Sequence, residues 1–169
     1  METALNICAF LTEEINNVSE ETKIRVPAVE GFFTVDNEPH LIGGRYKKSG
    51  SYCFPKNLGG SDPNVSDDEL EEVLLSRYGK IWSYTNSAYP PPPPFIASEP
   101  YEPIVIAAVE LEEEKMVVLG QVANGYSVED LSIGMSVEVD TGILYEDSEH
   151  CYLTWMWRPL PEGPNKDKK

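Results

Sequence analysis

The sequence predicts a mainly β protein whose second half forms a five-stranded barrel, preceded by an N-terminal helix and a turn-rich segment. Three observations lead there: short apolar or alternating runs in the second half, a cluster of glycines before it, and helical spacing of apolar residues at the start. The expected units are an N-terminal helix (1–26), a turn-rich segment (27–65), a linking helix (66–78), a barrel (79–160) and a flexible tail (161–169).

The barrel is predicted from five runs that have the length and pattern of strands. One of them, Pro103 to Leu111, is almost continuously apolar, which is typical of a strand buried on both faces. The runs span residues 81–85, 103–111, 116–122, 136–140 and 152–157, and a capped helical turn at 127–131 lies between the third and the fourth. Five strands with a short helix in this place is the order of an oligonucleotide/oligosaccharide-binding (OB) fold.

Two helices are expected before the barrel. From Thr3 to Val18 the apolar residues recur every three or four positions, and the resulting apolar face either packs on the chain's own barrel or docks on a partner. The run Ser66-Asp67-Asp68-Glu69 has the form of a capping box and Gly79 is a natural stop, so a linking helix is expected between them. The apolar stripes are Leu5, Cys8, Leu11, Ile15 and Val18 in the first helix, and Leu70, Val73 and Leu74 in the second.

Composition excludes several classes of protein. Twenty-nine acidic residues against thirteen basic ones give a formal net charge of −16, which repels phosphate backbones and anionic lipids, so neither nucleic acid nor membrane is expected as a partner. No apolar run approaches the roughly 20 residues that span a bilayer, and the N-terminus does not resemble a signal peptide. The cysteines Cys8, Cys53 and Cys151 form no closely spaced pair, which fits a reducing cytoplasm.

A run of prolines is predicted to be a binding element. Five consecutive prolines between Tyr89 and Phe95 adopt a stiff, extended left-handed helix of about 15 Å, at ~3.1 Å per residue. The run either braces a long loop between the first two barrel strands or presents a preformed contact to a partner with little loss of entropy. We favour the contact, because a simple connection does not need this stiffness. The predicted partner-binding residues are Tyr89, Pro90, Pro91, Pro92, Pro93, Pro94 and Phe95.

Four basic residues lie close together in the turn-rich segment, in a chain that is otherwise strongly acidic. Either they belong to an ordinary solvated surface, or they meet a CoA phosphate or an acidic partner. We treat them as possible CoA-contacting residues: Arg45, Lys47, Lys48 and Lys56.

Several separated motifs resemble one known family over about residues 25 to 160. They are Phe54-Pro55, the run Gly79-Lys80-Ile81-Trp82-Ser83-Tyr84-Thr85, the proline loop, the apolar strand at 103–111, Leu119-Gly120, the run from Val128 to Val137, and Trp157-Arg158-Pro159. The family joins a rubredoxin-like zinc ribbon to an OB-fold, accompanies thiolases and related condensing enzymes, and includes the small subunit of benzoylsuccinyl-CoA thiolase. The resemblance implies a non-catalytic accessory subunit that assists assembly and acyl-CoA access. It also implies a thiolase-like catalytic partner that handles the acyl-CoA, in a heterotetramer of two plus two chains.

The zinc cysteines of that family are missing here. Where the family has an Arg-Cys-x-x-Cys-Gly pattern, this sequence has Arg45 followed by Tyr46, Lys47, Lys48, Ser49 and Gly50, and no cysteine pair follows Phe54-Pro55. Tetrahedral zinc needs four ligands, and the segment offers only Cys53 and His40. We therefore expect a degenerate ribbon without zinc or any other cofactor, with an aromatic core of Tyr46, Tyr52 and Phe54 in its place.

Catalysis by the chain itself is not expected. The two histidines, His40 and His150, lie in no recognised catalytic motif, and we interpret Cys53 as a packed thiol in preference to a nucleophile. The alternative function is a single-stranded nucleic-acid-binding OB-fold, with aromatic residues as stacking platforms. Its candidate platforms are Trp82, Tyr84, Trp155 and Trp157.

Overall fold

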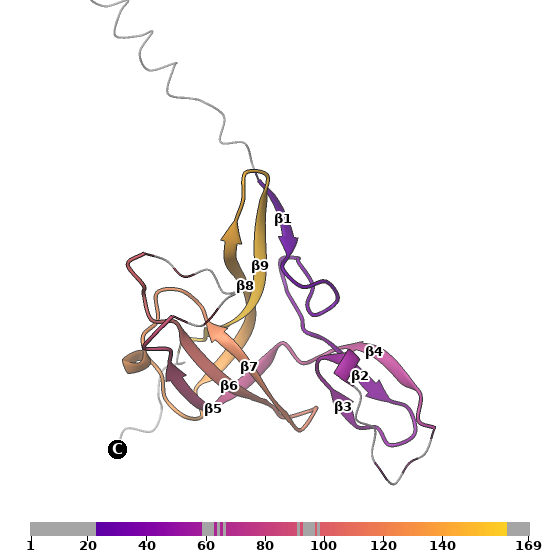
Figure 1. The fold of residues 1–169 in the computed structure, drawn as a ribbon. Coiled ribbons are helices and arrows are strands. Elements are labelled where there is room, and N and C mark those ends of the chain that lie inside the picture. The colour runs from indigo at the N-terminus through magenta and orange to yellow at the C-terminus, as the bar shows by residue number, and fades with distance from the viewer. Residues whose placement is uncertain are drawn as a thin grey trace, which may run out of the picture.

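The computed structural model describes residues 23–58, 63, 65, 67–90, 92, 97 and 99–161. Within these residues the protein is almost entirely β, as predicted, with a six-stranded and a three-stranded sheet and two short 3₁₀ turns. Figure 1 shows the two sheets as a large barrel and a smaller lobe beside it. No helix in this described part of the chain is long and apolar enough to cross a membrane.

The large sheet closes into the predicted OB barrel. Its strands are β5 (Tyr78–Asn86), β6 (Val105–Leu111), β7 (Met116–Val122), β8 (Ser136–Glu146) and β9 (His150–Pro159). They follow the order β5-β6-β7-β9-β8, and the antiparallel pairing of β8 with β5 closes the ring. The turn η2 (Val128–Asp130) lies between β7 and β8, where the sequence predicted a capped helical turn. The fold class predicted from the sequence is confirmed.

Side chains that alternate along the strands fill the barrel. Along β6 the inward residues are buried, and the small outward Ala108 is covered as well. Trp157 at the end of β9 is fully buried and is the largest side chain of the core. Burying apolar surface stabilises a fold by about 25 cal/mol per Å², so this interior supplies the main driving force for closure. The largest fully buried side chains of the barrel are Ile81, Val109, Leu111, Val137, Val139, Leu153 and Trp157.

Strands β8 and β9 continue beyond the barrel as a hairpin, and β1 (Ile24–Pro27) lies parallel to β9 along it (Figure 1). This strand occupies the end of the segment for which the sequence predicted an N-terminal helix. The amphipathic run Thr3–Val18, on which that helix was based, lies outside the described residues. A strand of four residues is too short to show a clear period of two, so sequence patterning does not detect β1.

The small sheet, which we call the ribbon, takes two strands from the segment predicted as the ribbon (27–65) and its third from the segment predicted as the linking helix. It consists of β2 (Ile42–Tyr46), β3 (Tyr52–Cys53) and β4 (Leu70–Leu74) in the order β3-β2-β4, and the turn η1 (Lys56–Leu58) follows β3. The ribbon does not have a separate core. Phe33, Leu41 and Leu75, which flank its strands, belong to the same buried cluster as the barrel interior. The two predicted units therefore pack as one body.

The predicted linking helix at 66–78 is wrong, because β4 and the start of β5 occupy this segment. Asp67 has a φ of 53°, outside the right-handed helical region. The carboxylate of Asp68 does not cap a helix; it accepts hydrogen bonds from the backbone amides of Lys48 (2.7 Å) and Ser49 (2.9 Å). Pairing of β4 with β2 satisfies the hydrogen-bonding groups of the backbone, so tertiary contacts override the local helical signal.

Candidate functional site

The loop between β5 and β6 carries the predicted proline-rich contact, and its base is fastened by hydrogen bonds. The amide of Ser87 donates to the carbonyl of Ile104 (2.9 Å), and the hydroxyl of Tyr101 donates to the carbonyl of Ser87 (2.9 Å). The hydroxyl of Ser87 also donates to the carbonyl of Tyr89 (2.8 Å). The outgoing and returning arms of the loop are thereby held together where they leave the barrel.

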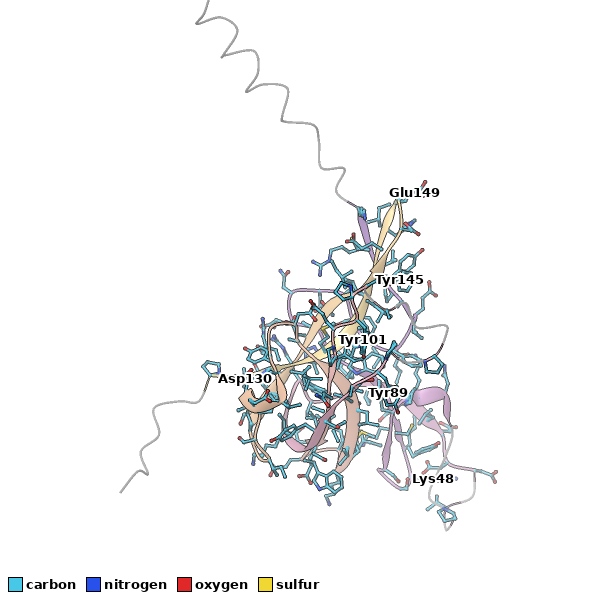
Figure 2. All side chains as sticks on the ribbon, turned by 60° about the vertical axis from the view of Figure 1, so that its left-hand side comes forward. Lys48, Tyr89, Tyr101, Asp130, Tyr145 and Glu149 are labelled. Atoms are coloured by element: carbon cyan, nitrogen blue, oxygen red, sulfur yellow. The ribbon has the colours of Figure 1, made fainter. Side chains whose placement is uncertain are left out.

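Tyr89 is presented at this fastened base with 74% of its surface exposed. Tyr101, which holds the base, is half-buried beside it, and both are labelled in Figure 2. Pro90 and Pro92 are exposed as well. The other predicted contact residues, Pro91, Pro93, Pro94 and Phe95, lie outside the described residues. An exposed aromatic side chain on a fixed backbone has the features of an interface anchor.

The four predicted CoA-contacting residues lie on the ribbon, and each contacts a residue of the acidic segment 67–72. Lys47 pairs with Glu69 (2.9 Å), Arg45 lies 3.9 Å from Glu71, and Lys56 pairs with Glu72. The ammonium of Lys48 donates to the carbonyl of Asp67 (2.8 Å). Because these acids follow one another into β4, they largely neutralise the basic patch, and a CoA phosphate would have to compete with them.

The ribbon does not offer a zinc-binding donor set. Cys53 is half-buried in β3 and is the one thiol of the described ribbon. The ring of His40 contacts the carbonyl of Glu38 (2.8 Å). No group of three or more His, Cys, Asp or Glu side chains is arranged to hold a metal in the part of the chain that the structure describes. The residues present therefore do not fit tetrahedral zinc.

Aromatic side chains join the ribbon to the barrel at the position predicted for a separate aromatic core. Phe54 meets Trp155 of β9 edge-on, with ring centroids 5.7 Å apart and planes at 90°. Phe32 and Phe33 lie 6.1 Å and 5.9 Å from the same indole. Tyr46 is buried in β2, while Tyr52 packs against the shared core. The sequence identified three of these residues, but it did not indicate that Phe54 packs on the barrel.

The β8–β9 hairpin carries a further cluster of titratable groups near its tip. The thiol of Cys151 donates to a carboxylate oxygen of Glu146 (2.9 Å), and Lys23 pairs with the other oxygen (2.7 Å). The hydrogen bond to Glu146 and burial raise the pKa of Cys151, which makes it a weak nucleophile. His150 lies 3.6 Å from Asp147, and neither described histidine ring hydrogen-bonds a thiol or hydroxyl. Among the described residues, no histidine is paired with a thiol or a hydroxyl, and the thiol beside a carboxylate, Cys151, has a raised pKa.

The candidate stacking platforms for nucleic acid are mostly enclosed. Trp157 is fully buried, and Tyr84 and Trp155 pack against the core cluster. The hydroxyl of Tyr84 donates to the carbonyl of Leu131 (3.0 Å). Trp82 alone of the four is exposed, so successive bases would have no aromatic surface to stack on.

An open cavity of about 500 Å³ lies at the end of the barrel next to the proline loop. The returning arm of the loop lines one side, and the connection after β7 lines the other. Its polar side chains are Glu102, Gln121, Asn124 and Tyr126. These groups can accept and donate hydrogen bonds but supply no nucleophile.

The geometry defines an OB-fold domain with a ribbon packed on it. In agreement, the family model of the ChsH2 C-terminal OB-fold domain matches residues 72–142. A chain of the Ltp2-ChsH2(DUF35) aldolase is similar at 25% identity with a TM-score of 0.54, covering 71% of this chain and 84% of that chain. These matches support the resemblance stated from the sequence: the barrel is similar to the OB-fold domain of ChsH2, and most of the chain is similar to a chain of that aldolase.

Proposed function

We propose that this chain is a non-catalytic accessory subunit of a thiolase-like acyl-CoA-processing complex, in which it assists assembly and acyl-CoA access. The observation that carries the proposal is the likeness to a chain of the Ltp2-ChsH2(DUF35) aldolase, which extends over 71% of this chain. The partner is a thiolase, an acyltransferase or an aldolase, and the complex contains two copies of each chain.

The chemistry of the described residues supports a role without catalysis. Acyl transfer needs an activated nucleophile with a base beside it. The thiol of Cys151 instead donates a hydrogen bond to Glu146 and has a raised pKa, and the ring of His40 contacts a backbone carbonyl. We therefore assign the reacting groups and the acyl-CoA site to the partner. Contact between CoA and Arg45, Lys47, Lys48 or Lys56 is a subsidiary prediction.

The proline loop supports the partner-binding part of the proposal. Its base is fastened by Ser87 and Tyr101, so Tyr89 is ordered before any partner arrives. A preordered aromatic loses little entropy on binding, and buried aromatic anchors commonly contribute about 2 kcal/mol or more to an interface.

The test uses the full chain and a thiolase-like protein from the same genome, purified separately and then mixed. We expect a two-plus-two complex by light scattering. Tyr89→Ala should weaken association by about thirty-fold while the melting temperature of the free chain hardly moves. Leu74→Ala, an exposed apolar residue on the ribbon, serves as the matched control. A loop that only braces its own barrel gives the opposite pattern, with a lower melting temperature and unchanged association.

Turnover of the assembled complex tests the non-catalytic role. Cys53→Ala should leave turnover within a few-fold of the unchanged chain, because the reacting thiol is on the partner. A loss of several orders of magnitude in an intact complex would make Cys53 a catalytic group.

A further inference from the structure

A bulge in β5 turns a large aromatic side chain outward. The pairing of β5 with β6 shifts register between Ile81 and Ser83, so Trp82 is an extra residue on its strand. Ile81 points into the core and is almost fully buried, whereas Trp82 remains 62% exposed. β-Bulges commonly re-aim a side chain in this way, often next to functional surfaces.

The outward Trp82 lies near other outward apolar side chains of the barrel wall. Ser83 beside it pairs with Ala108 of β6, and Ala108 pairs with Leu119 of β7. On the other side, the backbone of Ile81 exchanges hydrogen bonds with Gly134 (2.8 Å) and Met135 (2.9 Å). Ile133 precedes Gly134 and is therefore held close to the part of β5 that carries Trp82. We call the set Trp82, Ala108, Val117, Leu119 and Ile133 the barrel belt.

The barrel belt exposes an unusually large apolar surface for a strand face that contacts only solvent. Ile133 is 75% exposed and Leu119 is 66% exposed. Together with Trp82 and Val117 they amount to several hundred Å², on the order of the 300–600 Å² of functional patches on single chains. A stable interface takes roughly 800 Å² from each partner, so a dimer through the belt alone would be undersized.

Acidic side chains border the barrel belt on two sides. Glu110 of β6 pairs in register with Lys80 and with Val117, and Glu112 follows it. Lys80 lies 3.5 Å from Glu112 and so offsets only part of this charge. A groove of about 230 Å³ passes between these side chains and Tyr78. At the opposite side, beyond Ile133, η2 carries Glu129 and Asp130, and Figure 2 labels Asp130 at the edge of the barrel.

We propose that the barrel belt is a second docking surface for the thiolase-like subunit, on a patch of that partner with an apolar centre and a basic rim. The inference rests on the proposed function and extends it from the loop to the barrel wall. The acidic border complements basic side chains and repels nucleic-acid phosphates. The proline loop leaves from the end of β5, the same strand that carries Trp82, so loop and belt together supply the area that the belt alone lacks.

Fluorescence of Trp82 tests the proposal directly. Trp157 is fully buried and Trp155 is half-buried, so Trp82 is the indole most open to acrylamide in the free chain. We expect the purified thiolase-like protein to protect the quenchable indole, and W82F to remove that signal. The double variant W82A/L119A should weaken association at least thirty-fold without changing the melting temperature, since both side chains are exposed.

Leu74→Ala is the control, since Leu74 is also a mostly exposed apolar side chain but lies on the ribbon. If Tyr89→Ala weakens association but W82A/L119A behaves like Leu74→Ala, the belt inference is overturned and the proposed function stands. If the two proteins do not associate at all, both the belt inference and the proposed function are refuted. Protection of Trp82 by a single-stranded oligothymidylate, or by raising the concentration of the chain alone, would overturn the inference in favour of nucleic acid or a second copy.

Discussion

Replacing Phe33 by alanine tests whether the ribbon and the barrel share one core. Phe33 precedes the ribbon strands, is only 4% exposed, and packs with Trp155 of β9 at a centroid distance of 5.9 Å. Removing a buried phenylalanine side chain destabilises a protein by about 3–5 kcal/mol, through lost burial and the cavity that remains. Domains of this size are stable by only about 5–15 kcal/mol, so the loss is a large part of the total.

Denaturant unfolding with native-state hydrogen exchange measures the effect. We expect one cooperative transition at lower denaturant concentration, with reduced protection of ribbon amides in β2 and of barrel amides in β6 alike. Phe33→Leu keeps most of the apolar volume and should cost about 1 kcal/mol. Val35→Ala, an exposed change two residues away, should stay within about 0.5 kcal/mol. Barrel amides that keep their protection while ribbon amides lose it would refute the shared core.

A double-mutant cycle on Phe54 and Trp155 isolates the aromatic contact between the two sheets. Their edge-to-face geometry predicts a coupling of about 0.5–1.5 kcal/mol beyond the area that each ring buries. A coupling near zero would mean that the rings only fill space.

Three further predictions concern the interior, the hairpin tip and the ribbon. Gly120→Ala should destabilise the protein by about 1–3 kcal/mol in denaturant unfolding, because a Cβ there would lie 2.8 Å from Nε1 of Trp157 and 2.9 Å from Nε1 of Trp155; an unchanged midpoint would contradict the close packing. At the tip, amide hydrogen bonds from Glu149 and His150, with the hydroxyl of Tyr152, lower the pKa of Asp147 to about 2 from its ordinary 3.8. The ionised carboxylate therefore stabilises the tip fully above its ordinary pKa, and this stabilisation is lost as the pH falls through about 2. Over that pH range, the protection of the Glu149 and His150 amides against hydrogen exchange should decline. In the Asp147→Asn variant the protection should not change with pH. Elemental analysis of the purified chain should find no stoichiometric zinc, and one tightly held zinc per chain would direct attention to Cys53 and His40.

The strands of the barrel are predictable from the sequence because their signals are local. The apolar run at 103–111 corresponds to β6, and the alternation at 136–140 lies in β8. The stop signals between the strands are also local, since they depend on one or two residues in a turn. Motifs spread along the chain were enough to indicate the resemblance that the matches support, although the likeness could not say which residues lie on the surface.

The prediction of a linking helix was wrong because the residues that suggested it make other contacts in the folded chain. Ser66 to Glu69 has the residue types of a capping box, but the carboxylate of Asp68 within this run can also accept hydrogen bonds from amides elsewhere in the chain. In the folded chain those amides belong to the turn after β2, 19 and 20 residues away in the sequence. The ion pairs of the basic patch were not predictable from the sequence for the same reason, because Arg45 lies opposite Glu71 only after β4 has paired with β2.

The sequence alone therefore determined the class of fold, the order of the barrel strands along the chain, the acidic character of the chain and the lack of closely spaced cysteine pairs. Tertiary structure decided which residues form the surface: the bulge that exposes Trp82, the acids that neutralise the ribbon, and the aromatic contacts that join ribbon to barrel. The division has a physical cause. Strand patterns and turns depend on residues a few positions apart, whereas bulges, ion pairs between strands and shared cores depend on pairing register, which only closure of the whole barrel sets.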